Sequence, residues 1–182
     1  VYHAIDKRVP DTFQQQQALH YIQKEIPHIP VQADGLPHED LELVPTTNWQ
    51  PYTWSVNNVA LAENLNTALA FWQGGNPEAG YKLFESALVE SMYLGASPGG
   101  FQQLSFYDAI RGELYRDFAD PIGVASRALV EGLFGIQPNL LEHKLKIKPG
   151  FPEEWDHANL NLPDLDVAFK KTGNTTTYTI TN

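Results

Sequence analysis

The sequence predicts a mainly α fold, built from antiparallel helical hairpins and followed by a small C-terminal antiparallel β segment. Two segments with helical spacing of apolar residues, 56–73 and 76–95, are separated only by a short Gly-Gly-Asn-Pro turn, so they pack side by side in opposite directions. After Pro138 the apolar spacing changes from about 3.6 residues to about 2. We therefore expect an α portion over residues 1–139 and a β-strand segment over residues 140–182.

Residues 11–26 form the first predicted helix, because apolar residues recur at helical spacing and Pro27 ends the pattern. The apolar residues are Phe13, Leu19, Ile22 and Ile26. A proline-rich stretch over residues 28–52 follows and is predicted to be loop. A loop of this length inside a compact domain is more often functional than idle.

Three further predicted helices each have an apolar side and a recognisable end. Residues 56–73 stop at two glycines, and Asn76 then caps the helix over 76–95 with a proline in its first position. The last helix begins at the cap Asp120 and runs to Gly135. The residues expected to face inward are Val59, Ala62, Leu65, Leu69 and Trp72; Leu83, Phe84, Ala87, Leu88 and Met92; and Ile122, Ala125, Leu129, Leu133 and Phe134.

The β segment is predicted from three runs in which apolar and polar residues alternate. These runs are 141–148, 165–169 and 175–180. In the first, two leucines and an isoleucine share one face, opposite a glutamate and three lysines. Thr172–Gly173–Asn174 has the composition of a hairpin turn between the last two runs.

Composition argues against several classes of function. The chain has no cysteine, and hence no disulfide framework, thiol nucleophile or thiolate metal site. Its formal net charge of −10 would repel nucleic acid and anionic membranes, so we expect neither as a partner. No apolar run approaches the roughly 18–20 residues that span a bilayer. The six histidines show no metal-ligand spacing and no nucleotide fingerprint occurs, so we expect no metal and no cofactor.

The most informative stretch is TTNWQPYTWSVNN, residues 46–58. Trp49, Tyr52 and Trp54 lie there among threonines, a serine and asparagines. Aromatic rings suit the C–H faces of sugars, while amides and hydroxyls suit sugar hydroxyl groups. The alternative interpretation is that these rings fill the protein interior at a helix end, and composition alone leaves both open.

Turn lengths place this stretch at the same end of the helices as a second polar and aromatic stretch, residues 97–120. In an antiparallel arrangement the long loops emerge at one end and the Gly-Gly-Asn-Pro turn at the other. Sugar hydrolysis needs two carboxyl groups, one protonated and one ionised. The acidic candidates in the loops are Glu39, Asp40, Glu42, Asp108, Glu113, Asp117 and Asp120, with Glu63 inside a predicted helix.

Spacing alone does not select a catalytic pair from these acids. Asp120 is explained most simply as a helix cap, and Glu63 as a solvated or hydrogen-bonded helix residue. Glu113 and Asp117 flank Arg116, so this group also fits a structural ion-pair network.

Two stretches resemble a known enzyme superfamily. They are WQPYTWSVNNVALAENLNTALAFWQGG and FADPIGVASRALVEGLFGIQPNLLEHKLKIKPGFPEEW. Both are similar to the C-terminal part of the six-hairpin glycosidases, the (α/α)6-toroid enzymes that include bacterial α-L-rhamnosidases, trehalases and glucoamylase-like enzymes. The likeness is greatest to a bacterial family of unknown function in that superfamily, encoded among polysaccharide-degrading proteins. The matching motifs are Trp49, Pro51 and Trp54; Leu133 to Ile136; and Pro149 to Trp155.

The resemblance covers most of residues 46–170 and implies a fold, an activity and a set of site residues. The fold would be a partial toroid containing the last hairpins, and the chain a portion of a glycoside hydrolase that acts on a glycan. Glu113 occupies the place of the catalytic base, with Asp117 as second choice. Trp49, Tyr52 and Trp54 would hold the sugar, and Asn57 or Asn58 would fix its hydroxyl groups. The general acid of such enzymes lies in an earlier hairpin that this chain lacks.

Two other interpretations remain beside the enzyme. The chain is also compatible with a non-catalytic carbohydrate-binding or structural module that keeps the aromatic residues and lacks the general acid. A partial toroid is further expected to cover its open side by self-association or by the remainder of a longer polypeptide. An oligosaccharide or polysaccharide is the expected partner, in the periplasm or at the cell surface rather than in the cytoplasm.

Overall fold

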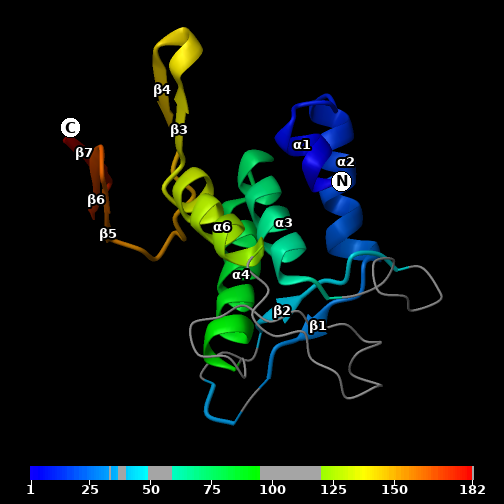
Figure 1. Ribbon diagram of the computed structural model, residues 1–182. Coiled ribbons are helices and arrows are strands. Elements are labelled where there is room, and N and C mark those ends of the chain that lie inside the picture. The colour runs from blue at the N-terminus through cyan, green and yellow to red at the C-terminus, as the bar shows by residue number, and fades with distance from the viewer. Residues whose placement is uncertain (33, 37–39, 49–58, 95–119, 182) are drawn as a thin grey trace. The chain divides into compact units, whose positions relative to one another are not determined.

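The computed structural model describes residues 1–32, 34–36, 40–48, 59–94 and 120–181 (Figure 1). The chain divides into two compact units, Val1–Gly150 and Phe151–Asn182. The first unit holds the helices and two short sheets, and the second holds one three-stranded sheet.

The predicted fold class, a mainly α partial toroid with a small β segment, is wrong for the described residues. Helices take up 46% of these residues and strands 24%, and the seven strands form three separate antiparallel sheets. The β1–β2 pair joins two-residue segments that are too short to show an alternating pattern, so no signal in the sequence predicted this sheet. The described part is therefore a mixed fold of helices and antiparallel sheets.

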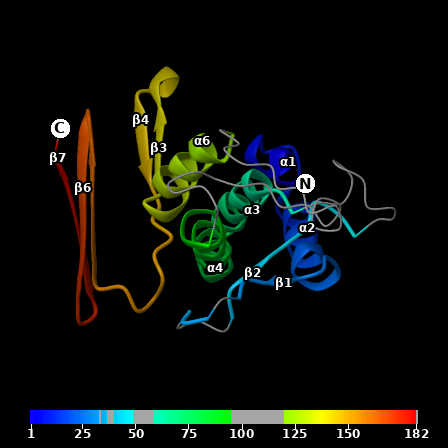
Figure 2. The same ribbon diagram turned by 60° about the horizontal axis from the view of Figure 1, so that its bottom comes forward.

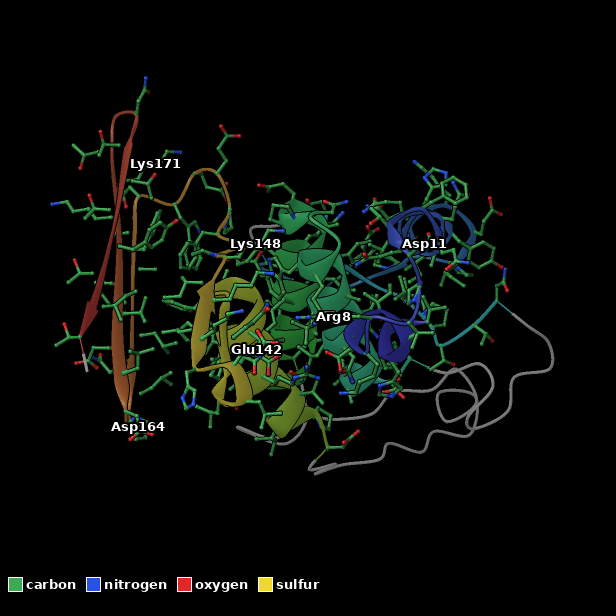
Figure 3. The ribbon with its side chains drawn as sticks, turned by 90° about the horizontal axis from the view of Figure 1, so that it is seen from above. Arg8, Asp11, Glu142, Lys148, Asp164 and Lys171 are labelled. Carbon is green, nitrogen blue, oxygen red and sulfur yellow. The ribbon has the colours of Figure 1, made fainter. Side chains whose placement is uncertain are left out.

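Helix α1, Tyr2–Asp6, and helix α2, Thr12–Glu25, open the first unit. The side chain of Asp11 accepts a hydrogen bond from the Gln14 backbone N–H, and the side chain of Gln14 accepts one from the Asp11 backbone N–H. This reciprocal cap fixes the start of α2; Figure 3 labels Asp11 there. The predicted helix is confirmed, although Phe13 is 71% exposed and only Leu19 and Ile22 of its apolar residues are buried.

Helix α3, Leu61–Gln73, is the centre of the first unit and lies between α1 and α2 on one side and α6, Asp120–Arg127, on the other (Figures 1 and 2). It contacts α1, α4, α6 and the π-helix η2, Ala128–Leu133. A helix with neighbours on several sides buries most of its residues, and ten of the thirteen residues of α3 are buried, Leu61, Leu65 and Leu69 among them. It begins later than predicted, since Val59 and Ala60 are not helical.

Helix α4, Pro77–Leu88, runs antiparallel to α3, as predicted. The Asn76 side chain accepts a hydrogen bond from the Ala79 backbone, and Pro77 occupies the first turn, which confirms the predicted cap. The helix then widens into the π-helix η1, Val89–Tyr93. The extra residue per turn changes which side chains face inward. As a result Ser91 is fully buried, whereas Met92, predicted to face inward, is 47% exposed.

Trp72, in the last turn of α3, is buried among several elements of the first unit. Its ring lies against Phe84 of α4, with ring centroids 5.6 Å apart. Its indole N–H donates a 2.9 Å hydrogen bond to the carbonyl of Gly150. Three glycines, Gly80, Gly132 and Gly150, approach the ring so closely that a Cβ on any of them would lie within about 3 Å of its atoms. The indole ring thus holds α3, α4, η2 and the chain before Phe151 together.

Helix α6 and η2 lead into a hairpin of β3, Ile136–Asn139, and β4, Lys144–Ile147. Gly135 makes the turn into β3 at φ +65°, where a side chain would meet the Lys148 carbonyl. The expected strand from Leu141 is wrong at its start, because residues 140–142 form a 3₁₀ turn and Leu141 is 96% exposed. Ile122, predicted to face inward from α6, is 48% exposed.

The second unit is the antiparallel sheet β5–β6–β7, formed by His157–Leu162, Leu165–Thr172 and Thr175–Thr181. Phe169 of the central strand is buried and stacks on Phe151, with centroids 4.6 Å apart. Thr172 pairs with Thr175 across a turn in which Gly173 has φ +58°, which confirms the predicted hairpin. Asp164 marks the β5–β6 turn and Lys171 lies toward the other end of β6 (Figure 3).

No helix among the described residues has the length and apolar character needed to cross a membrane.

Replacing Gly132 with alanine tests the packing around Trp72. The new Cβ would lie 2.1 Å from Cε3 of the indole ring, so we expect a loss of about 1–3 kcal/mol in the free energy of unfolding, measured by urea denaturation. Gly123→Ala is the matched control, because no atom lies within 4 Å of its added Cβ. That control should gain about 0.5–1 kcal/mol from helix propensity. Equal effects of the two substitutions would contradict the tight packing.

Candidate functional site

The residues predicted to bind or hydrolyse a glycan all lie outside the described residues. They are Trp49, Tyr52, Trp54, Asn57, Asn58, Glu113 and Asp117. Their roles stay predictions. What the structure describes is the framework that flanks them: the chain up to Asn48, the start of α3, the end of η1 and the start of α6.

These flanking elements meet at one end of the α3–α4 hairpin. The turn at Gly75 joins α3 to α4 at the opposite end. Leu61 and Val89 are equally far from Gly75 along the chain, so η1 starts level with the first residue of α3 and continues α4 beyond it. We call the end formed by the start of α3, η1 and the start of α6 the open end.

Asn64, in the first turn of α3, fastens the chain that leads to the predicted sugar-binding stretch. Its side chain is fully buried and accepts a 2.8 Å hydrogen bond from the Val44 N–H. Its amide nitrogen donates to the Val44 carbonyl and to the Ala60 carbonyl, both at 2.9 Å. The side chain thus pairs with Val44 as a neighbouring strand would. This pairing explains how a polar residue is tolerated in the core.

A second attachment holds the strand pair β1, Ile29–Pro30, and β2, Glu42–Leu43, against α4. The hydroxyl of Ser86, fully buried on α4, accepts a 3.0 Å hydrogen bond from the Glu42 N–H. The Glu42 carboxylate contacts His28 Nδ1 and Lys82 Nζ, each at 2.9 Å. Although burial opposes the charged form, these two partners lower the pKa of Glu42. Backbone and side chain of Glu42 therefore both hold β2 in place.

Tyr2 brings two carboxylates of the open end together. Its hydroxyl donates a hydrogen bond to the Glu63 carboxylate of α3. Burial, followed by the charges of Glu63 and Asp120, raises the pKa of the Tyr2 hydroxyl well above its ordinary value. Because charge effects of this kind act over short distances, Asp120 lies near this pair. Asp120 is the first described residue of α6, and its side chain is exposed.

Asp6 and Arg127 form the ion pair that ties α1 to α6. Arg127 donates from both terminal nitrogens to the two oxygens of Asp6, and it also holds Glu131 through two hydrogen bonds. Gln73 of α3 donates a further bond to Asp6. These bonds, above all those from Arg127, hold the pKa of Asp6 well below its usual range. This network joins α1 and α6 to the last turn of α3, at the end of the hairpin opposite the open end.

The open end also contains a carboxyl group that the sequence did not single out, Glu90 of η1. It is half-buried, and burial raises the pKa of its carboxyl above the ordinary value. A signal did exist in the sequence, because Glu90 falls three residues after the fully buried Ala87, on the apolar side of a helical pattern. Tyr2 gave no such signal, since its partners come from distant parts of the chain.

Among the described residues no group of three or more histidine, aspartate and glutamate side chains is arranged to hold a metal ion. The carboxylates near Tyr2 are suited instead to accept hydrogen bonds from hydroxyl groups or to transfer protons.

A comparison with models of protein families matches none of them, and a comparison with curated proteins finds no relative.

Asn64→Ala tests the attachment of the chain before the predicted sugar-binding stretch. The change leaves the buried N–H and C=O of Val44 without the Asn64 side chain as partner, so the free energy of unfolding should fall by about 2–6 kcal/mol, at about 1–3 kcal/mol for each group. Urea denaturation measures the loss. Asn66→Ala, at a partly exposed position of the same helix, is the matched control and should change stability by less than about 1 kcal/mol. A stable Asn64→Ala variant would contradict the attachment.

The Asp6 ion pair predicts a specific pH dependence of stability. The pKa of Asp6 is lower in the folded state than the ordinary value of about 3.9, so its stabilisation is complete above that value and is lost as the pH falls from about 5 toward the folded-state pKa. The difference in unfolding free energy between wild type and Asp6→Asn should be largest near neutral pH and shrink below about pH 4.

Urea denaturation at several pH values measures this difference. Asp34→Asn, at an exposed position, is the control and should leave the pH profile of the wild type unchanged. An Asp6→Asn profile parallel to that of the wild type would count against the ion pair.

Proposed function

We propose that this chain is a portion of a glycoside hydrolase that acts on an oligosaccharide or polysaccharide. The observation that carries the proposal is that the elements next to the two predicted site stretches lie at the open end. The stretch with Trp49, Tyr52 and Trp54 leads into the start of α3, and the stretch with Glu113 and Asp117 leads from η1 to α6. Aromatic residues and carboxylates are the two groups that sugar hydrolysis requires.

The proposed reaction is attack of water at the anomeric carbon. Glu113, as general base, takes a proton from the water while the bond from the anomeric carbon to the leaving oxygen breaks. The rings of Trp49, Tyr52 and Trp54 stack on the sugar, and Asn57 or Asn58 binds its hydroxyl groups. Similarity of both stretches to the six-hairpin glycosidases supports this assignment.

Several described features fit such a role. Asn64 and Ser86 fasten the chain at Val44 and Glu42, a few residues before the aromatic stretch, which suits a site that must hold its ligand in one position. Glu63 and Asp120 add carboxylates at the same end, available to accept hydrogen bonds from sugar hydroxyl groups.

The alternative function is a carbohydrate-binding module without catalysis. It is favoured by the resemblance, because the matched C-terminal part of the six-hairpin glycosidases does not include their general acid. The two functions share the aromatic stretch and differ in turnover, so the wild type is compared with a variant that should lose turnover and keep binding.

Glu113→Gln in the full-length protein is that variant. We expect turnover of an oligosaccharide substrate to fall by about 10²–10⁴-fold, because glutamine cannot take the proton from water. Binding of the same oligosaccharide, measured by isothermal titration calorimetry, should remain within a few-fold of wild type. Glu153→Gln, an exposed glutamate of the second unit, is the control and should leave both unchanged.

The results separate the candidate functions. Binding without hydrolysis by the wild type would support the module, and neither binding nor hydrolysis would leave a structural role. Hydrolysis that survives Glu113→Gln would move the base to another carboxylate, with Asp117→Asn as the next variant to measure.

A further inference from the structure

Strand β7 forms one edge of the sheet in the second unit. Within the described residues its only strand neighbour is β6, with which it pairs along its whole length (Figure 1). In an antiparallel strand, alternate residues direct their backbone N–H and C=O groups to opposite sides. Every second residue of β7 therefore presents these groups at the edge of the sheet. Their spacing is complementary to one kind of partner, another extended strand.

The apolar face of this sheet is incompletely covered at the same edge. Val167 of β6 pairs with Ile180 of β7, and Phe169 pairs with Tyr178, so the members of each pair lie on one face. The two β6 residues are buried, whereas Ile180 and Tyr178 are 45% and 42% exposed. The residues of β5 on this face are half-buried. The exposed part of the apolar face thus runs along β7.

Strand β7 also lacks the features that keep exposed edges from pairing. Such edges are usually short, or contain a lysine, a proline or a β-bulge. The sequence of β7, TTTYTIT, has no charged residue and no proline, and its register with β6 runs without a bulge. Its seven residues make it longer than a typical strand. This edge is therefore able to accept a further strand.

The sequence of β7 favours a second copy of the same strand as the partner. TTTYTIT reads almost the same in both directions from Tyr178. In an antiparallel pair centred on Tyr178, each threonine of the polar face lies opposite a threonine of the other copy, as Thr175–Thr181 and Thr177–Thr179 pairs. Cross-strand pairs of threonines and of aromatic residues are favourable. Although the chain carries a formal charge of −10, no like charges meet along this strand.

We propose that two copies of this chain associate through β7. The two β7 strands pair antiparallel about a twofold axis at Tyr178 and join two three-stranded sheets into one continuous sheet. The added strand covers the outer sides of Tyr178 and Ile180. This surface lies entirely in the second unit, so the inference does not depend on the glycoside hydrolase function proposed above.

Sedimentation-velocity centrifugation of this chain at increasing concentration tests the association. The wild type should pass from monomer to dimer below about 1 mM, the range in which weak specific association is measurable.

Two double variants test the pairing itself. Thr177→Glu/Thr179→Glu places carboxylates opposite one another at both threonine pairs, so the dissociation constant should rise by about tenfold or more. The fold of each copy should tolerate this change, because Thr177 lies opposite Lys170 of β6. Thr177→Glu/Thr179→Lys brings opposite charges together at the same positions and should restore the dimer.

His157→Glu/Asn159→Glu is the matched control. These two residues face, from β5, the same β6 residues that Thr177 and Thr179 face from β7. The control adds the same two carboxylates to the other edge of the sheet, and should leave dimerisation unchanged. Urea denaturation of all four proteins checks that each is folded.

Each outcome decides between partners. A wild type that stays monomeric at about 1 mM would overturn a second copy as the partner and leave the edge to a strand of other origin. A dimer that persists unchanged in Thr177→Glu/Thr179→Glu would place the association on another surface. If Thr177→Glu/Thr179→Lys does not restore the dimer, or the control weakens it equally, the pairing about Tyr178 is wrong.

Discussion

The first unit depends on the burial of one indole ring. Trp72 meets α4 through Phe84, η2 through Gly132 and the chain before the second unit through Gly150, to which it also donates its hydrogen bond. Burying a ring of this size removes more apolar surface from water than any other single residue can. Because three glycines are needed to admit it, the ring fixes the distances among these segments as well as their association.

The two ends of the α3–α4 hairpin differ in the kind of residue that they contain. Trp72 and the Gly75 turn lie at one end and hold the helices together. The other end carries Asn64, Tyr2, Glu63 and Glu90, polar groups that a core would not otherwise contain. The tight packing at the first end offsets the cost of polar groups at the second, a division common in proteins whose sites conflict with stability. A rigid framework of this kind can hold aromatic and acidic side chains in fixed positions around a ligand.

Local signals in the sequence were sufficient for part of this fold. Asn76 followed by proline marked the start of α4, and the glycine in Thr172–Gly173–Asn174 marked the last hairpin. Both could be predicted because a helix cap and a hairpin turn are formed by residues that are adjacent in sequence. The pairing of Ile29–Pro30 with Glu42–Leu43 had no such signal, since each segment is only two residues long and Glu42 is held by Ser86, which is distant in sequence. The same holds for Tyr2, whose partners Glu63 and Asp120 are distant in sequence. The π-helical turns were not predicted either, because helical periodicity assumes a constant number of residues per turn.

The central claim is that the open end of the α3–α4 hairpin binds a glycan. Amide chemical-shift mapping by NMR, during titration with oligosaccharides of rhamnose, glucose or xylose, tests it most directly. A binding sugar should shift the amide signals of Val44, Asn64, Ser91 and Asp120, and leave those of Gly75 and Asn76 at the closed turn unchanged. Shifts at Gly75 and Asn76 without shifts at Asn64 and Ser91, or no shift with any of the sugars, would contradict the claim.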